Sequence, residues 1–316
     1  MIDTEKLNQA LSLWNLNNKK YELIAFRENV TYKTFDSDGQ QLVLRFHRKN
    51  YSSKEEINSE LKWLSALNKE KINVPKSIKS INKNFIEKVN DQYVSVLTWI
   101  NGNPLTKLKS CEKSLENNKI FYNLGKELAK LHLFSDVWNN KETLRKRTWN
   151  IEGLLGENPI WDRFWSNPEL SETQINQIIL MKIKCQTILG HNLKDLDYGL
   201  IHADAVRDNV LFNNSKKVQL IDFDDSGYGF RLFDIATTLL YYLRNKNFLI
   251  IKNNLIKGYL SIRNLNMELL DIFILIRSFT YVGWNISRIN EPNGMQRNKK
   301  YINNIFFTYE KLKIRF

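Results

Sequence analysis

The fold of this chain is decided by residues 200–236, which read LIHADAVRDNVLFNNSKKVQLIDFDDSGYGFRLFDIA. Two apolar, β-prone runs in this stretch, Val210–Phe212 and Val218–Ile221, flank the polar turn residues Asn213–Lys216. Two such runs around a short polar turn predict an antiparallel hairpin. In a hairpin, the start of the first strand lies beside the end of the second.

Four polar residues stand where this hairpin meets its loops. His202, Asp204 and Asn209 precede the first strand, and Asp222 follows the second. We therefore expect Asn209 and Asp222 to be neighbours, with Asp204 on the adjoining loop. Mg²⁺ prefers carboxylate and amide oxygens, and a nearby aspartate can orient or deprotonate an acceptor hydroxyl, so the spacing suits phosphoryl transfer. Asp and Asn also often end strands, which explains single residues better than four together.

The same residues carry a resemblance to a known family. The run His202–Asp204, then Asn209 and then Ile221–Asp224, resembles the signature of the aminoglycoside phosphotransferase and choline kinase family. These are small-molecule kinases with a protein-kinase-like fold, whose signature is HGD, four residues and N, followed by IDF or IDW. By this resemblance Asp204 is the catalytic base, and Asn209 and Asp222 are the Mg²⁺ ligands. His202 corresponds to a loop-bracing histidine, with an ordinary buried, hydrogen-bonded histidine as the alternative.

The resemblance extends into the first hundred residues. Residues 28–32 (ENVTY) and Leu42–Arg48 are similar to the hairpin that covers the nucleotide in this family. Arg45 takes the place of the strand lysine that holds the ATP phosphates, and Glu60 that of the helix glutamate that pairs with it. A surface cation on a strand and a solvated helix face are the alternative interpretations of these two residues.

Two further segments match the family. Leu97–Ile100, before Asn101-Gly102, looks like the adenine-binding hinge, in which backbone groups of Thr98 and Ile100 meet the base. Leu124–His132 resembles the first helix of the C-terminal lobe, usually written LG-x-x-LA-x-LH. The resemblance therefore covers nearly the whole chain.

We accordingly expect an α+β, two-lobed, protein-kinase-like fold. Residues 1–100 are predicted to form the nucleotide-binding lobe, a small antiparallel sheet with one helix, up to and including the hinge. Residues 101–316 are predicted to form the larger, mainly helical catalytic and substrate-binding lobe. The predicted elements are strands at 30–35, 41–47, 83–88 and 93–100, a helix at 53–69 opened by a capping box of Ser53 and Glu56, and helices at 118–134 and 171–189.

The chain departs from the family pattern at three of these positions. Ala203 replaces the usual glycine, which a loop accepts if the backbone φ there is negative. Arg45 replaces lysine, and its planar guanidinium can grip phosphate with two donors. Asp224 stands where protein kinases have glycine, which favours the small-molecule branch. The hairpin also lacks G-x-G-x-x-G, so we expect no glycine-rich phosphate cradle.

The composition is that of a globular protein with a basic surface. Hydrophobic residues make up 42% and charged residues 26% of the 316, which excludes a mostly disordered chain. Lys and Arg total 47 against 34 Asp and Glu, a formal charge of +13. A polyanion-binding face is one interpretation, but the basic residues are scattered singly, as on a solvated surface. We therefore expect no nucleic-acid partner.

The sequence predicts neither membrane insertion nor secretion. The apolar run Leu269–Trp284 is short and contains Asp271 and Arg277. The first residues, MIDTEKLNQA, lack the apolar run of a signal peptide. Cys111 and Cys185 form neither a metal-binding spacing nor a disulfide framework. We expect a cytoplasmic protein with no membrane partner.

The resemblance implies an ATP- and Mg²⁺-dependent O-phosphotransferase for a small hydroxylated substrate, such as an aminoglycoside-like antibiotic, an amino alcohol or a sugar. GTP stays open as the donor. A bacterial Ser/Thr protein kinase of the same fold is an alternative, which the eleven residues between Asp222 and Asp234 disfavour because they leave little room for an activation segment. A basic nucleic-acid-binding protein is a second alternative. The sequence sets neither the acceptor nor the oligomeric state.

Two sets of residues are candidates for binding the acceptor. Aromatic residues in Ile151–Pro168 and Arg277–Arg288 either line its pocket or pack in the core. A cationic acceptor requires clustered acids, and the candidates are Glu152, Glu157, Asp162, Asp224 and Asp225.

Overall fold

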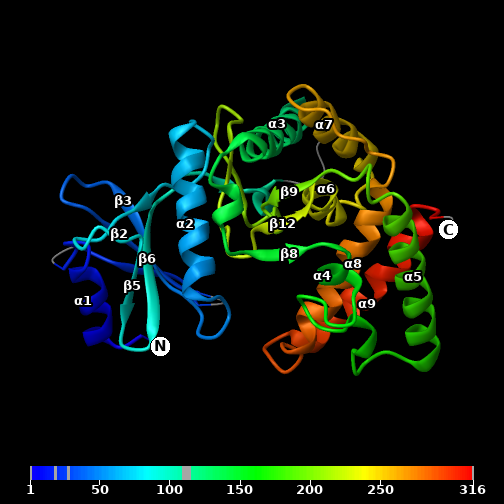
Figure 1. Ribbon diagram of the computed structural model, residues 1–316, viewed down its shortest axis with the longest axis horizontal. Coiled ribbons are helices and arrows are strands. Elements are labelled where there is room, and N and C mark those ends of the chain that lie inside the picture. Colours follow the sequence, from blue (N-terminus) through cyan, green and yellow to red (C-terminus); the bar gives the residue numbers. More distant parts are fainter. Residues whose placement is uncertain (1, 18–19, 27–28, 109–114, 315–316) are drawn as a thin grey trace.

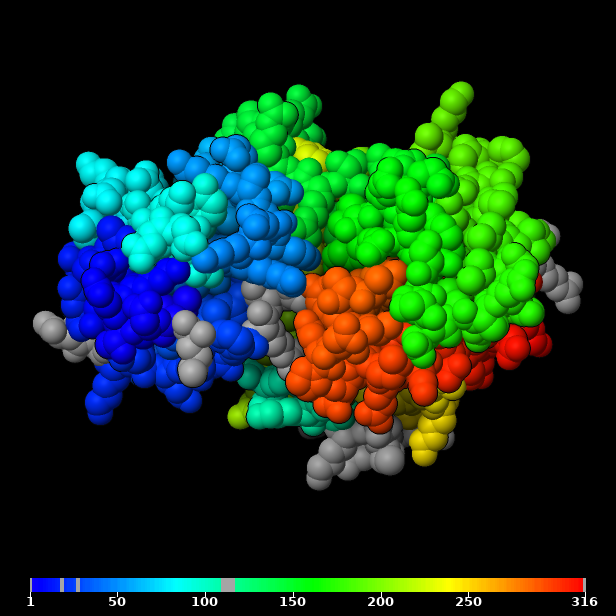
Figure 2. Space-filling view, turned by 90° about the horizontal axis from the view of Figure 1, so that it is seen from below, coloured from blue at the N-terminus to red at the C-terminus, as the bar shows by residue number. Residues whose placement is uncertain are grey.

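The computed structural model of the protein describes residues 2–17, 20–26, 29–108 and 115–314 (Figure 1). Glu28 of the predicted hairpin and Cys111 lie outside these residues. The chain forms a small lobe around an antiparallel sheet and a larger, mainly helical lobe, so the predicted α+β class and two-lobed architecture are confirmed. Figure 2 shows them from another side, with the small lobe in blue and cyan at one end and the large lobe at the other.

The small lobe is built on one sheet with the strand order β1-β2-β3-β6-β4, in which β5 also pairs with β6. Its elements are α1 (Thr4–Ser12), β1 (Glu22–Phe26), β2 (Val30–Phe35), β3 (Gln41–Phe46), α2 (Lys54–Lys69), β4 (Ser77–Ile78), β5 (Ile86–Val89) and β6 (Gln92–Thr98). Alternation along β2 and β3 turns Tyr32, Leu42 and Leu44 into a core that Leu7 and Leu11 of α1 complete. The predicted β2–β3 hairpin is confirmed, whereas α1 and β1 were not predicted.

The large lobe combines helices with two three-stranded sheets, β11-β10-β7 and β8-β12-β9. Its elements are β7 (Asn103–Pro104), α3 (Leu115–Val137), β8 (Arg147–Trp149), α4 (Ile151–Leu155), α5 (Glu172–His191), β9 (Tyr198–Ile201), β10 (Val210–Phe212), β11 (Val218–Leu220), β12 (Gly227–Phe230), α6 (Arg231–Leu240), α7 (Phe248–Leu260), α8 (Leu270–Ile286) and α9 (Gly294–Lys311). The helices predicted at 118–134 and 171–189 correspond to α3 and α5. The hairpin predicted from the opening stretch is β10–β11.

Helix α2 joins the two lobes. Ser53 Oγ accepts from Glu56 N at 3.1 Å while Glu56 accepts from Ser53 N at 2.8 Å, which is the predicted capping box. Leu61 and Leu64 on its apolar face belong to the same hydrophobic cluster as the core of the large lobe. The indole N–H of Trp63 also donates to Ser135 of α3 at 3.1 Å. The helix is therefore anchored to the large lobe as well as to its own.

Helix α8 lies at the centre of the large lobe, where it packs against α6 and α9 (Figure 1). Most of its residues are buried, which accounts for the apolar run at 269–284.

Within the described parts of the chain, the helices are all too short or too polar to cross a membrane. Cys185 is a buried free thiol in α5.

A buried carboxylate, Asp234 of α6, connects three parts of this lobe. It accepts hydrogen bonds from His132 Nε2 of α3 at 3.0 Å, from His202 N at 2.8 Å and from Ala203 N at 2.7 Å. All four residues are fully buried. Because a buried carboxylate is stable only when its oxygens are satisfied, this contact fixes the backbone of residues 202–203 against two helices.

We predict that stability falls in mild acid, in part because of His132. Burial lowers the pKa of His132 from 6.5 to about 4, so the unfolded chain binds a proton that the folded protein does not. Stability rises with pH wherever the unfolded state binds more protons, so this contribution is present above pH 6.5 and is lost toward pH 4. At pH 5 the loss is about 2 kcal/mol.

Urea unfolding at pH 7 and pH 5 measures this loss in the wild type and in His132→Gln. The variant is less stable at pH 7, but its stability changes less between the two pH values because it lacks the titrating ring. An equal pH dependence in both proteins would contradict the assignment.

Candidate active site

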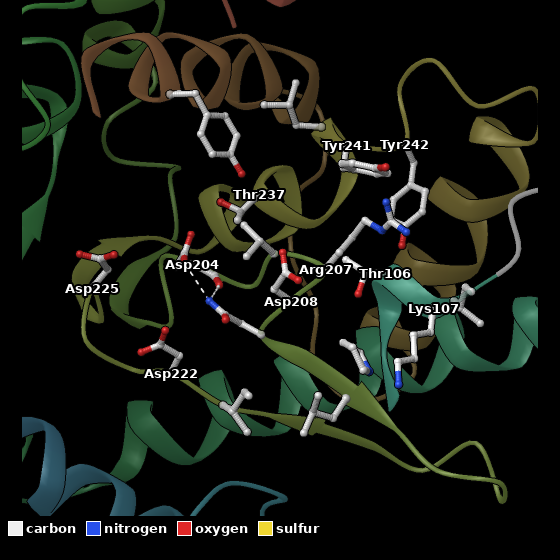
Figure 3. A pocket seen from close by; sticks show the side chains of 18 of the residues that line it. Thr106, Lys107, Asp204, Arg207, Asp208, Asp222, Asp225, Thr237, Tyr241 and Tyr242 are labelled. Carbon is white, nitrogen blue, oxygen red and sulfur yellow. Dashed lines mark hydrogen bonds between the residues drawn. The ribbon is translucent and has the colours of Figure 1, made fainter. Parts of the chain in front are cut away.

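The β10–β11 hairpin brings the predicted polar residues together. The backbone N–H of Ile221, the residue before Asp222, donates to Asn209 O at 3.0 Å. Asn209 and Asp222 are therefore neighbours, as expected. Asn209 Nδ2 donates to Asp204 twice, to the backbone O at 3.0 Å and to the carboxylate Oδ2 at 2.8 Å. Figure 3 shows Asp204 and Asp222 at one end of a pocket, with Asp225 beside them.

Buried groups brace the loop that carries Asp204. The fully buried ring of His202 donates from Nε2 to Ile221 O at 3.0 Å and accepts at Nδ1 from Asp204 N at 3.2 Å. Burial lowers the pKa of His202, which keeps the ring neutral. His202 therefore lies behind the loop and does not line the cleft, a place that suits bracing rather than contact with substrate.

The backbone at Ala203 is not in the conformation that we expected. Its φ is +64°, in the left-handed region, where a negative value was expected. This conformation costs an L-residue about 1–2 kcal/mol. The loop is therefore strained at the position where the family has glycine, and the bond from Ala203 N to Asp234 holds it there.

Carboxylates crowd around Asp222. Its own carboxylate opens into the cleft, and within the described residues no hydrogen bond or ion pair engages it. Burial raises the pKa of Asp222 well above its usual range. The charges of Asp224, Asp204 and Asp225 add to this rise, and Arg45 opposes it. A cation beside Asp222 would relieve this repulsion.

Asn209 and Asp222 fit a magnesium ion. Because Asn209 Nδ2 is committed to Asp204, its Oδ1 is the atom left to coordinate a cation. Among the residues that the structure describes, no three or more His, Cys, Asp or Glu side chains converge to enclose a metal. Mg²⁺ in nucleotide sites is usually held by one or two protein groups together with phosphate oxygens, so two ligands suffice.

Arg45 of β3 links the small lobe to this site. Its buried guanidinium lies 2.8 Å from Glu60 Oε1 of α2 and 2.8 Å from Asp224 Oδ1. Asp224 also accepts from Asn29 Nδ2. Burial alone would raise the pKa of Asp224, but Arg45 and its other donors hold it at about 2. The structure thus forms the expected Arg45–Glu60 pair and extends it to a carboxylate of the large lobe.

Thr98 and Ile100 both line the cleft where the chain passes between the lobes. Thr98 N donates to Lys76 O at 2.9 Å, so this N–H is not available to a nucleotide. Lys76 N donates to Thr98 Oγ1 at 2.9 Å rather than to the Thr98 carbonyl. Of the backbone groups of Thr98, the carbonyl oxygen is therefore the one left to contact the base. The contact expected from Ile100 stays a prediction.

The cleft, about 2700 Å³ in volume, continues from the carboxylates into the large lobe, where Figure 3 shows Arg207, Tyr241 and Tyr242 at its far end. Three aromatic residues of the segments Ile151–Pro168 and Arg277–Arg288 line this cleft, namely Trp161, Tyr281 and Trp284. Others stack in the core, as Phe164 does on Phe279 at 4.8 Å between ring centres. Each interpretation of these segments is therefore right for part of them.

The acids considered for a cationic acceptor do not form a free anionic pocket. Asp224 is held by Arg45, and Asp225 accepts from Tyr51 Oη and Arg147 Nη1 at 2.6 Å each. Three others do not line the main cleft: Glu152, Glu157 and Asp162. Of the five candidates only Asp224 and Asp225 line the cleft, and the fold uses both to join its own elements.

Sequence reasoning missed two residues of the site, Asp234 and Arg277. Arg277 Nη2 of α8 lies 2.8 Å from Asp204 Oδ1, and its side chain is fully buried. Burial raises the pKa of Asp204 to about 6, and Arg277 opposes this rise. A single arginine within an otherwise apolar helix was a signal for a buried ion pair. Its partner, 73 residues away along the chain, was not visible without the fold.

We predict that Ala203→Gly is stabilising. Glycine removes the left-handed penalty but adds chain entropy to the unfolded state, so the free energy of unfolding rises by up to about 1 kcal/mol. Ala203→Val, with a branched side chain at the same buried position, lowers it by more than about 2 kcal/mol. Urea unfolding of the three proteins checks this order; a destabilised glycine variant would show that the loop is not strained at this residue.

Comparison with known proteins places this architecture in a family. The family model described as "Phosphotransferase enzyme family" matches residues 22–263. Homoserine kinase of Agrobacterium fabrum is 26% identical over 171 residues, 52% of this chain and 50% of that protein. Homoserine kinase of Chelativorans is 22% identical over 279 residues, 84% of this chain and 80% of that protein. The chain thus spans about half the length of the first of these relatives.

Solved structures share the fold over almost the whole chain. A microcompartment-associated aminopropanol kinase superposes with a TM-score of 0.81 at 25% identity, covering 98% of both chains. Amicoumacin kinase, solved with AMP-PNP, Ca²⁺ and amicoumacin, superposes with a TM-score of 0.77 at 19% identity, covering 96% of this chain and 93% of that one. The match over 242 residues and the common two-lobed fold confirm the resemblance seen in the sequence: this chain belongs to the phosphotransferase enzyme family.

Proposed function

We propose that the protein is a Mg²⁺- and ATP-dependent kinase that phosphorylates a hydroxyl group of a small molecule. The observation that carries this proposal is the convergence of Asp204, Asn209 and Asp222 on one cleft, opposite the Arg45–Glu60 pair of the other lobe. Residues 1–100 form the nucleotide-binding lobe in this proposal, and residues 101–316 the catalytic and acceptor-binding lobe.

The nucleotide occupies the part of the cleft next to the hinge. The adenine base bonds to the carbonyl of Thr98 and the backbone of Ile100, and Arg45 donates to the phosphates while Glu60 holds its guanidinium in place. Asn209 and Asp222 hold Mg²⁺, which when bound neutralises phosphate charge and fixes the phosphates for transfer. One solved structure of this fold, amicoumacin kinase, contains AMP-PNP, which supports an adenine nucleotide, and GTP remains the alternative donor.

Asp204 orients the acceptor. Its side chain is 23% exposed to the cleft, so a substrate hydroxyl can reach it and donate a hydrogen bond to the carboxylate. The hydroxyl oxygen is then directed at the γ-phosphate. As the new P–O bond forms, the bond from the γ-phosphorus to the β,γ-bridging oxygen breaks, ADP leaves with that electron pair, and the hydroxyl proton passes to Asp204. Because catalysis of phosphoryl transfer consists mostly of positioning and electrostatics, a weakly basic carboxylate is sufficient.

The cleft favours a small amino alcohol or hydroxy amino acid as the acceptor. Its wall of Trp161, Tyr281 and Trp284 offers aromatic contacts for a compact molecule. Asp224 and Asp225, the two acids considered for a cationic acceptor that line the cleft, are already engaged by Arg45 and Arg147, which disfavours a polycationic aminoglycoside. The names of the relatives, homoserine kinase and aminopropanol kinase, agree with this class of acceptor.

A protein substrate is disfavoured by the segment after Asp222. The chain enters β12 at Gly227 and α6 at Arg231, so no long activation segment stands between the metal-binding loop and the helix. The proposed kinase function also explains why Asp204, Asn209 and Asp222 lie together, and this explanation needs no nucleic-acid partner.

We predict that Asp204→Asn and Asp222→Asn separate chemistry from nucleotide binding. ADP release with Mg-ATP is measured with homoserine, aminopropanol, choline, an aminoglycoside and simple sugars as acceptors. Asp204→Asn lowers kcat by at least about 10²-fold but keeps the rise in melting temperature that Mg-ATP causes. Asp222→Asn loses both, because it removes a metal ligand.

The exposed Asp195, remote from the cleft, provides the matched control as Asp195→Asn, which leaves both readouts unchanged. An Asp204→Asn enzyme with wild-type kcat would exclude Asp204 as the group that orients the acceptor. A wild type whose melting temperature does not respond to Mg-ATP would exclude the nucleotide site.

We predict that Arg45→Lys mainly weakens nucleotide binding. One ammonium cannot replace two guanidinium nitrogens that each lie 2.8 Å from a different carboxylate, on Glu60 and Asp224. KM for ATP is expected to rise about tenfold, the effect of one lost charge-assisted hydrogen bond. Arg163→Lys, an exposed exchange away from the main cleft, is the control. An unchanged KM in Arg45→Lys would remove Arg45 from the nucleotide site.

A further inference from the structure

We propose that Arg277 is a positioning residue for phosphoryl transfer, which fixes the carboxylate of Asp204 to the helix that forms a wall of the acceptor cleft. The inference rests on the proposed function, in which Asp204 orients the acceptor hydroxyl. Arg277 lies on α8, and Asp204 lies on the loop before β10, so the contact joins two separate elements of the large lobe.

Both oxygens of the Asp204 carboxylate are held. Arg277 Nη2 lies 2.8 Å from Oδ1, and Asn209 Nδ2 donates to Oδ2 at 2.8 Å. Two donors from different elements fix the direction of the carboxylate as well as its position. Each oxygen can accept a second hydrogen bond, so each keeps an acceptor site that a substrate hydroxyl can use. Arg277 therefore restricts the orientation of the Asp204 carboxylate and still leaves it able to accept a hydrogen bond from the substrate.

Arg277 cannot act on the substrate directly. Its side chain is 0% exposed and is not part of the cleft lining, whereas the side chain of Asp204 is 23% exposed and faces the cleft. An acceptor in the cleft therefore reaches the carboxylate but not the guanidinium. Arg277 therefore influences the acceptor only indirectly, through the groups that it contacts, and its ion-pair partner among them is Asp204.

Aromatic rings keep Arg277 in place. Its guanidinium lies 4.8 Å from the ring centre of Trp161, 5.3 Å from that of Phe233 and 4.5 Å from that of Tyr281. Such contacts stabilise a cation that is removed from water. A fully buried arginine is costly unless it is paired, and the ion pair with Asp204 is the charge that compensates it.

The position of Arg277 on α8 connects it to the acceptor wall. Tyr281 and Trp284 follow at four and seven residues, which places them on the same face of the helix, and both line the cleft. The anchor of Asp204 and two aromatic residues of the acceptor wall are therefore parts of one rigid, buried helix. We infer that this arrangement fixes the distance between the bound acceptor and the carboxylate that orients it.

A double-mutant cycle tests the proposal. Arg277→Met is made in the wild type and in Asp204→Asn, and kcat and KM are measured with Mg-ATP and homoserine or aminopropanol. In the wild type we expect kcat to fall about 10²-fold while KM for ATP changes less than about threefold. In the Asp204→Asn background we expect a much smaller loss, because the carboxylate that Arg277 positions is already removed.

Arg263→Met is the matched control. This arginine also pairs with carboxylates, lying 2.7 Å from Asp136, but it is outside the cleft. Its effect on kcat should be small and equal in both backgrounds. Should Arg277→Met fail to fold, Arg277→Lys, which keeps the charge, serves in the same cycle with a smaller loss of kcat. The rise in melting temperature with Mg-ATP shows that each variant keeps its nucleotide site.

The outcomes separate this inference from the proposed function. An equal loss of kcat from the Arg277 variant in both backgrounds overturns the positioning role, because it shows a purely structural effect. A wild type that neither phosphorylates an acceptor nor hydrolyses Mg-ATP overturns the proposed function and the inference together. A loss that is much larger in the background that contains Asp204 supports the inference.

Discussion

The active-site loop depends on one buried carboxylate, that of Asp234. Its two oxygens accept the backbone N–H groups of His202 and Ala203 and the side chain of His132. These bonds offset the left-handed strain at Ala203 and fix the direction in which the chain approaches Asp204. Because Asp234 lies in the first turn of α6, the helix that follows β12, the loop is tied to the packed centre of the large lobe rather than to solvent.

Around this loop the protein concentrates negative charge and balances most of it internally. Arg45 reaches Asp224 from the small lobe, and Arg277 reaches Asp204 from α8. Asp225 is held by Arg147, while the carboxylate of Asp222 has no such partner among the described residues. The uncompensated charge therefore lies at Asp222, next to the free oxygen of Asn209, and these two groups would hold the cation of the proposed site.

The two lobes contribute differently to this site. Most of the buried sheet residues form a hydrophobic cluster with α1, whereas the buried apolar residues of α2 belong to the cluster of the large lobe. Arg45 is carried by the sheet and Glu60 by α2, so the ion pair between them spans the two clusters. The aromatic wall of the cleft belongs to the large lobe alone, where α8 also carries the partner of Asp204.

Several features could be predicted from the order of the residues alone: the family, the β2–β3 and β10–β11 hairpins, the capped helix α2 and the neighbouring positions of Asn209 and Asp222. Each of these depends on residues close together in the chain, or on a motif with fixed spacing. Three other features became visible only in the folded chain: the left-handed backbone of Ala203, the burial of Arg277 against Asp204 and the use of Asp224 and Asp225 as internal ion-pair partners. These features result from contacts between residues tens to hundreds of positions apart, such as Arg45 and Asp224, and pairings of that kind are set by packing rather than by local pattern.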